Sequence, residues 1–133
     1  MSDGYAIKNI DEMEAVFGGS FKRARAELGI EAFGMQVVDL PPNLDRYPAH
    51  DHGEDGQEEV YIPMSGSAEI EIEGRRHPIE PGQMVRVSSG VTRQLFTGDD
   101  PLRVLIVGGV PGQAYEPSEL SKLGGPDPLA QQS

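Results

Sequence analysis

The sequence predicts an all-β domain, a sandwich or small barrel built from about eight short strands. The first observation is that 17 glycines and 11 prolines divide the 133 residues into short segments. Such a pattern is typical of strands joined by tight turns rather than of a helical bundle. The second is that most segments after residue 32 either alternate apolar with polar residues or are short apolar runs. A chain of this length suits one domain.

The first 31 residues are expected to form a strand and helical segment that packs on the barrel. Residues 5–9 are interpreted as a short edge strand. Residues 9–17 are interpreted as a short helix, because their apolar residues recur at helical spacing. Residues 20–28 predict one or two more helical turns, which end at Gly29.

Residues 32–110 are expected to form the barrel itself. Its clearest predicted feature is a hairpin between residues 59–64 and 67–74, joined at residues 65–66, because isoleucine alternates with glutamate in the second strand. Further strands are expected at residues 32–40, 77–79, 84–87, 92–96 and 102–110. Residues 111–133 are rich in glycine, proline and glutamine, so we expect an extended or mobile tail there.

Charge and composition exclude several classes of function. The formal net charge is −11, from 22 acidic and 11 basic residues, and such a surface repels nucleic-acid phosphates and anionic lipid. Cysteine is absent, which excludes a disulfide framework, a thiolate metal site and a cysteine nucleophile. No apolar run is long enough to suggest a signal peptide or a membrane span, so we expect a cytoplasmic protein.

The stretch "YPAHDHGEDGQEEVYIPMSG", residues 47–66, holds the main candidates for chemistry. His50 and His52 are two residues apart, so on an extended chain both imidazoles can point to one place. Two imidazoles and a carboxylate make a ligand set suited to Fe(II), Mn or Zn. Taken alone, however, an H-x-H pair is a weak signal, and in an acidic loop it favours two surface histidines.

This stretch resembles the first motif of the cupin superfamily, in which H-x-H is followed by a glutamate and by a strand that ends in glycine. Counting seven residues back from Gly66 selects Glu59 rather than Glu58 as the motif glutamate. The segment "GRRHPIEPGQMVRVSSGVTRQLF", residues 74–96, resembles the second motif. The resemblance implies a double-stranded β-helix, or jelly-roll barrel. It also implies a divalent metal (Fe, Mn, Zn or Ni) bound by His50, His52 and Glu59.

One position departs from the family pattern, because Arg93 stands where the second motif usually supplies a histidine ligand. A guanidinium has no lone pair to offer a metal. Three interpretations stay open. Arg93 binds a carboxylate or phosphate of the substrate beside a bound metal; it pairs with Glu59 and replaces the metal; or it points outward into solvent.

Strand parity adds further expectations around Glu59. Tyr61 shares its face, and therefore either offers a hydroxyl to the pocket as a substrate-binding residue or packs in the core. Pro63 predicts an edge or a bulge. The opposite face carries Val60, Ile62 and Met64, which need cover from the N-terminal segment or from a second subunit, so a homodimer is expected. Candidate core or pocket-wall residues at strand spacing are Phe33, Met35, Met84, Leu95, Phe96, Leu105 and Val107.

The function expected from the resemblance is that of a small cupin barrel protein that binds a divalent metal and a small, anionic organic molecule. A non-haem metal-dependent oxygenase or isomerase is the expected enzyme class, although no catalytic residue is assigned. The alternative is a non-enzymatic, metal-free cupin with a degenerate site that binds or senses a ligand. The fold alone does not decide between them.

Overall fold

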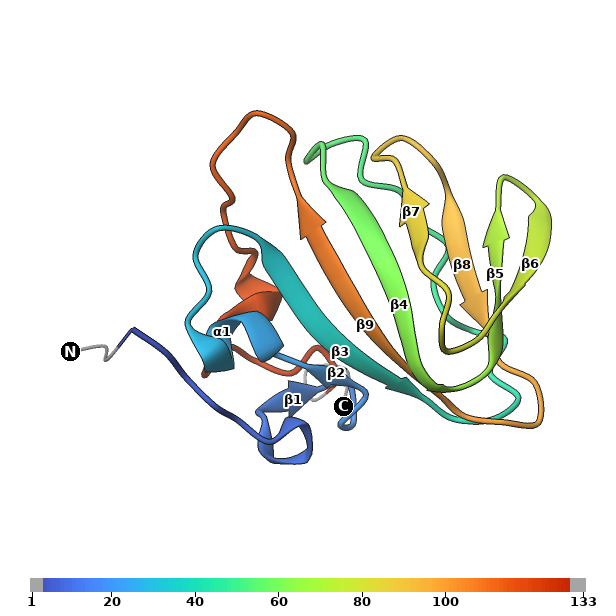
Figure 1. Ribbon diagram of the computed structural model, residues 1–133, viewed down its shortest axis with the longest axis horizontal. Coiled ribbons are helices and arrows are strands. Elements are labelled where there is room, and N and C mark those ends of the chain that lie inside the picture. The colour runs from blue at the N-terminus through green and yellow to red at the C-terminus, as the bar shows by residue number, and fades with distance from the viewer. Residues whose placement is uncertain (1–3, 130–133) are drawn as a thin grey trace.

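The computed structural model describes residues 4–129, and these form two antiparallel sheets that face each other as a jelly-roll barrel (Figure 1). The all-β fold predicted from the sequence is confirmed. In spatial order the large sheet contains β1 (Ala15–Val16), β2 (Phe21–Lys22), β3 (Gly34–Leu40), β9 (Leu102–Gly109), β4 (Glu58–Gly66) and β7 (Val85–Val87). The small sheet contains β6 (Arg75–Ile79), β5 (Ala68–Ile72) and β8 (Arg93–Phe96).

The N-terminal segment is less helical than the sequence predicts. The expected helix over residues 9–17 is a single 3-10 turn, η1 (Ile10–Glu12), because Phe17 and the two glycines after it adopt left-handed backbone angles and turn the chain from β1 into β2. No strand forms at residues 5–9. The second predicted helix is confirmed in shorter form as α1 (Ala24–Leu28), which ends at Gly29 with φ of 77°.

The predicted hairpin between β4 and β5 is wrong. Strand β4 pairs with β9 and β7, whereas β5 pairs with β6 and β8, so the chain crosses from the large sheet to the small one at Gly66. Gly66 has φ of 81°, and a Cβ there would lie 1.8 Å from the carbonyl oxygen of Pro101. The hairpin that does form joins β5 to β6 through Glu73 and Gly74, both with positive φ.

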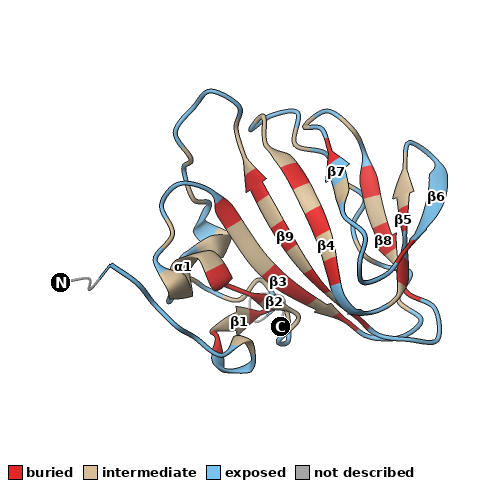
Figure 2. Ribbon diagram, in the orientation of Figure 1, coloured by how far each residue is buried: buried red, intermediate tan, exposed pale blue. Residues whose placement is uncertain are grey.

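The core lies between the two sheets, where buried residues alternate with half-buried ones along β4 and β9 (Figure 2). Of the predicted core residues, Leu95 is fully buried, but Met84 is 72% exposed. Leu105 and Val107 are only half-buried, because β9 turns its other parity inward. The main cluster consists of Val38, Leu40, Tyr61, Ala68, Ile70, Ile79, Val87, Leu95, Leu102, Val104 and Ile106.

The outer face of the large sheet is covered in part by the N-terminal segment. Met13 and Ala24 pack there against Val37, with Met35 and Leu105 at the edge of the cluster. The outward residues of β4 that were expected to need cover are half-buried at residues 60 and 62 and exposed at residue 64. The homodimer therefore stays a prediction. The predicted bulge is confirmed, because the register of β4 against β9 shifts between residues 63 and 65.

The C-terminal segment, residues 111–129, returns from β9 to the N-terminal segment and contains the 3-10 turn η2 (Glu119–Ser121) (Figure 1). It is anchored by Arg23, whose Nε donates to the carbonyl of Leu120 at 2.7 Å. Asp127 accepts a hydrogen bond from the N–H of Phe17 at 3.0 Å. Across residues 4–129, no helix has the length and apolar character required to cross a bilayer.

Candidate metal centre

The two histidines lie on an extended stretch of the β3–β4 connection that runs beside β8. The backbone of His50 exchanges two hydrogen bonds with that of Arg93, at 3.0 and 2.9 Å, and the N–H of His52 donates to Ser89 at 2.6 Å. Gln94 holds the same stretch through a 2.7 Å hydrogen bond to the carbonyl of Tyr47. This bridge places both imidazoles on one side of the stretch, with ring centroids 5.2 Å apart.

The structure brings the three predicted ligands together. Glu59 points inward from β4 and is 6% exposed. One ligand atom from each of His50, His52 and Glu59 lies within 4.8 Å of the others. The H-x-H pair and the glutamate come from different parts of the barrel wall and converge on one point, as a metal site requires.

The partners of the ring nitrogens orient both imidazoles for metal binding. Nδ1 of His50 lies 3.2 Å from the carbonyl oxygen of Pro48, and Nδ1 of His52 lies 3.0 Å from a carboxylate oxygen of Asp55. Both partners only accept hydrogen bonds, so each Nδ1 carries the proton and each Nε2 keeps its lone pair. Nε2 of His52 is buried and lies 3.3 Å from Oε1 of Glu59, without a regular hydrogen bond to any described residue. The residues therefore fit a divalent metal, which would satisfy that nitrogen.

The charge state of the cluster follows from its neighbours. Close contact with Glu59 raises the pKa of His52; burial opposes this, and Asp55 adds to it. For Glu59 the largest single influence is burial, which acts to raise its pKa. His52, Tyr61 and Arg93 together outweigh burial and hold that pKa below its usual range, so the carboxylate is ionised. A metal at this point would compete with the proton of His52 for the same Nε2.

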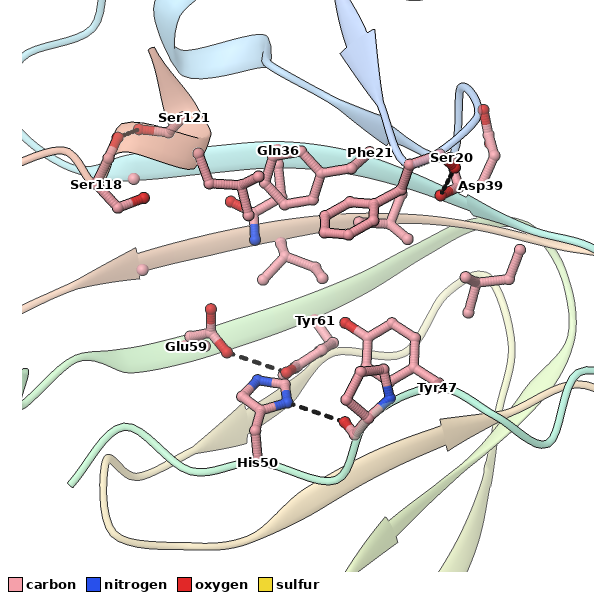
Figure 3. A pocket seen from close by; sticks show the side chains of 18 of the residues that line it. Ser20, Phe21, Gln36, Asp39, Tyr47, His50, Glu59, Tyr61, Ser118 and Ser121 are labelled. Carbon is pink, nitrogen blue, oxygen red and sulfur yellow. Dashed lines mark hydrogen bonds between the residues drawn. The ribbon is translucent and has the colours of Figure 1, made fainter. Parts of the chain in front are cut away.

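Tyr61 holds the carboxylate of Glu59 in place. Its hydroxyl donates to Oε1 of Glu59 at 3.0 Å, as Figure 3 shows, and both side chains line the same cavity. Burial, followed by the nearby charge of Glu59, raises the pKa of Tyr61, so the phenol stays neutral and keeps its proton. Oε2 of Glu59 has no hydrogen bond from any described residue.

Arg93 is fully buried, which excludes the outward, solvated interpretation. Its Nη2 lies 3.8 Å from Oε1 of Glu59 and donates to the carbonyls of Val87 and Ser88, both at 3.4 Å. Its Nε and Nη1 have no hydrogen-bond partner. Arg93 is absent from the described residues that line the neighbouring cavity, so its guanidinium lies behind Glu59. Substrate binding by Arg93 stays a prediction, and this placement does not add support to it.

A cavity of about 1030 Å³ adjoins the cluster. His50 and Glu59 lie on one wall, and the C-terminal segment supplies the opposite wall through Ser118 and Ser121 (Figure 3). Apolar and aromatic side chains such as Phe21 form much of the rest. Among the described residues that line it there is no lysine or arginine.

Sequence reasoning missed some of the supporting residues. Asp55 belongs to an acidic run whose side chains are usually solvated, yet it orients His52 from three residues away in the same turn. Tyr115 reaches the cavity from a segment expected to be an extended or mobile tail. A local signal existed only for Asp55, in its spacing from His52. His77, which lies outside the motif position, is exposed on β6.

Fold and site together define a jelly-roll barrel with a candidate metal centre on its inner wall. The family model described as the cupin domain matches residues 36–108, more than half of the chain. The chain therefore belongs to the cupin family, as the two motifs predicted. No curated protein sequence matches it.

Several solved structures similar to this chain are described as cupins. A cupin protein from Bacteroides fragilis has a TM-score of 0.68 and 19% sequence identity, covering 88% of this chain and 93% of its own. A sugar phosphate isomerase of the cupin superfamily from Silicibacter pomeroyi has a TM-score of 0.67 and 21% identity, covering 84% and 77%. A predicted oxalate decarboxylase from Thermotoga maritima has a TM-score of 0.52 and 24% identity, covering 58% and 65%. Similarity at this level of identity shows the shared fold.

Proposed function

We propose that this cupin binds one divalent metal ion through His50, His52 and Glu59 and acts on a small organic molecule held in the adjoining cavity. The observation that supports this most strongly is the orientation of the two imidazoles. Each Nδ1 faces an acceptor, so both Nε2 atoms are left to bind a metal beside an ionised carboxylate. Histidines that are incidental to an acidic surface loop have no reason to share this arrangement.

The role that we propose for each residue follows from its contacts. When bound, the metal supplies Lewis acidity or a site for dioxygen, and three protein ligands leave positions open. Asp55 keeps His52 in the binding tautomer, and Tyr61 holds Glu59. The apolar wall excludes water from the bound molecule. An oxygenase or isomerase is therefore the enzyme class that we propose.

An anionic ligand would be bound by the metal rather than by a side chain. No described lysine or arginine lines the cavity, and the lining carboxylates of Asp39, Asp55 and Glu59 make its wall negative. Asp39 is already paired with Lys22 at 2.9 Å and with Arg103 at 2.7 Å. A carboxylate or enolate oxygen of the ligand would therefore find its positive partner at the metal centre.

Metal analysis of protein purified without a histidine tag tests the proposal. We expect close to one equivalent of metal per chain, retained on dialysis and removed by a chelator. His52→Ala should lose it, whereas His77→Ala, which changes an exposed histidine on β6, should retain it. Substoichiometric metal that dialysis removes from the wild-type protein would contradict the proposal.

A second candidate function is a metal-free ligand-binding cupin. The observation that favours it is the contact between Arg93 and Glu59, because a buried guanidinium partly neutralises the carboxylate that a metal would need. Arg93→His distinguishes the two. If the site is merely degenerate, the new imidazole should create metal retention that the wild-type protein lacks. If the wild-type protein already holds metal in full, the metal-free candidate fails.

A further inference from the structure

Two glycines face the cavity beside the metal ligands. Gly34 of β3 and Gly108 of β9 are paired in register, and Gly108 is also paired with Glu59 of β4. Directly paired residues point to the same face of a sheet, so the row Gly34, Gly108, Glu59 crosses three strands on the inner face. At the usual strand spacing this row spans about 10 Å.

Both positions require glycine because neighbouring side chains leave little room for a Cβ, and not because of the backbone conformation. Neither has a positive φ, so an alanine would be sterically allowed by the backbone itself. A Cβ at Gly34 would lie 2.9 Å from the hydroxyl of Tyr115 and 3.1 Å from its ring. A Cβ at Gly108 would lie 3.0 Å from Oε1 of Gln57 and 3.3 Å from Cγ of Glu59. The missing side chains let Tyr115 and Gln57 lie against the sheet.

The polar ends of these two side chains have no partner among the described residues. Neither the Tyr115 hydroxyl nor the Gln57 amide makes a hydrogen bond with another described residue, and both residues line the cavity. Neutral hydrogen-bonding groups that face a mainly apolar cavity are the usual means of orienting a ligand there. The Tyr115 hydroxyl and the Gln57 amide lie over Gly34 and Gly108, in the same row of paired residues as Glu59.

The position of Tyr115 is set by the anchored C-terminal segment. Arg23, which is 1% exposed, donates to the carbonyls of Leu120 and Gly125 at 2.7 and 3.1 Å. Arg25 donates to Ser121 at 3.1 Å. These bonds hold the segment that carries Tyr115 against the barrel, opposite the metal ligands.

We infer that Tyr115, seated on Gly34, is a specificity-determining residue, and that the ligand is a hydroxylated organic acid. Its acidic oxygen would lie at the metal centre, and its neutral hydroxyl at the far end of the row would hydrogen-bond to Tyr115. Gln57, over Gly108, lies between these two ends. This inference rests on the proposed function, because the metal is what binds the acid group.

The test uses two probes that differ only in the distal hydroxyl, 4-hydroxybenzoate and benzoate, titrated calorimetrically into zinc-loaded protein. One hydrogen bond to Tyr115 should make 4-hydroxybenzoate bind about tenfold more tightly than benzoate. Tyr115→Phe removes only the hydroxyl and should abolish this preference. Gly34→Ala should also abolish it by displacing the ring, whereas Gly109→Ala should preserve it, because a Cβ at Gly109 meets nothing within 4 Å.

The preference for 4-hydroxybenzoate over benzoate tests the role of Tyr115, and metal binding tests the proposed function, so the two can fail separately. Equal binding of both probes to the wild-type protein, or a preference that survives in Tyr115→Phe, would overturn the role of Tyr115. If the protein holds no metal, the proposed function fails on its own, and the same titration on metal-free protein then decides the inference. If metal-free protein prefers 4-hydroxybenzoate and Tyr115→Phe abolishes this preference, the result supports the proposed role of Tyr115. If neither probe binds, the assigned ligand class is wrong.

Discussion

The protein contains two arginines that are almost completely buried, and their surroundings differ sharply. Arg23 is 1% exposed and Arg93 is 0% exposed. Arg23 makes three short hydrogen bonds, to Leu120, Glu14 and Gly125 at 2.7, 2.8 and 3.1 Å, and only its Nη2 has no partner among the described residues. The contacts of Arg93 are all long, at 3.4 Å to two carbonyls and 3.8 Å to its carboxylate partner, and two of its three nitrogens have no partner.

This difference separates a structural arginine from one that lies beside the candidate metal centre. Short charge-assisted hydrogen bonds compensate the loss of water around Arg23 and connect segments about a hundred residues apart in the chain. Arg93 is poorly compensated, and such groups are rare in the absence of a functional reason. Its nearest charge is Glu59, a candidate metal ligand, so its main influence falls on the metal centre rather than on stability.

The largest expected effect is on stability at Arg23. Arg23→Met leaves the carboxylate of Glu14 and two carbonyls without their donor, and should lower the free energy of unfolding by about 3 kcal/mol. Urea denaturation measures it. Arg86→Met, at an exposed arginine whose nearest carboxylate oxygen is 3.7 Å away, should change stability by less than about 0.5 kcal/mol. Equal losses of unfolding free energy in both variants would show that Arg23 does not stabilise the fold by holding the C-terminal segment.

The next effect contrasts the two carboxylate partners. Glu59→Gln removes a negative ligand and should weaken zinc binding by about 100-fold, measured by competition with a chromophoric chelator. Glu14→Gln should leave zinc affinity unchanged, because Glu14 serves only Arg23 and the N–H of Gly124. Similar zinc affinities for the two variants would break the distinction between the regions.

A smaller effect is expected at Arg93 itself. Arg93→Met removes a positive charge 3.8 Å from a ligand oxygen of Glu59, so zinc affinity should rise by about tenfold. Stability should change by no more than about 1 kcal/mol, because the lost hydrogen bonds are long. A loss of stability as large as that of Arg23→Met, or weaker zinc binding, would place Arg93 among the structural residues instead.

The parts of the site that sequence could predict are those carried by short-range pattern. Alternation along β4 placed Glu59 and Tyr61 on one inner face, and the two-residue spacing of His50 and His52 placed both imidazoles together. The glycine at the end of β4 selected, from an adjacent pair, the glutamate that lies beside the two histidines. Each of these depends on the chain within a few residues.

Features that depend on long-range contacts were not predictable. The alternation in β5 does not reveal which sheet the strand joins, and the supposed hairpin was therefore wrong. In β9 both parities carry large apolar residues, Val104 and Ile106 on one and Leu105 and Val107 on the other, so the run of apolar residues alone does not show which parity is buried. Tyr115 lies at the cavity in a segment that Arg23 and Arg25, far away in the chain, hold against the barrel. Whether the side chain of Arg93 points into the barrel or into solvent also depends on packing between distant segments, so the sequence left it open.

The smallest expected effect is the pH dependence of the Arg23 region. The hydrogen bond from Arg23 and then that from the N–H of Gly124 hold the pKa of Glu14 below its ordinary value of 4.5. Since the folded-state pKa is the lower one, Glu14 contributes its full stability above about pH 4.5 and loses it as the pH falls through the folded-state pKa. The contribution is small because the side chain is 38% exposed.

The measurement is the difference in unfolding free energy between the wild-type protein and Glu14→Gln from pH 7 to pH 3. A glutamine resembles the protonated acid, so the difference should stay constant above about pH 4.5 and shrink below it. Glu116→Gln, at an exposed glutamate, should show no such change. The difference in unfolding free energy between wild type and Glu14→Gln could also be the same at pH 3 as at pH 7. That result would mean that ionisation of Glu14 does not help Arg23 to hold the C-terminal segment. Arg23 would then be held by the backbone carbonyls of the C-terminal segment alone, and the contrast with Arg93 would rest on hydrogen-bond geometry rather than on charge.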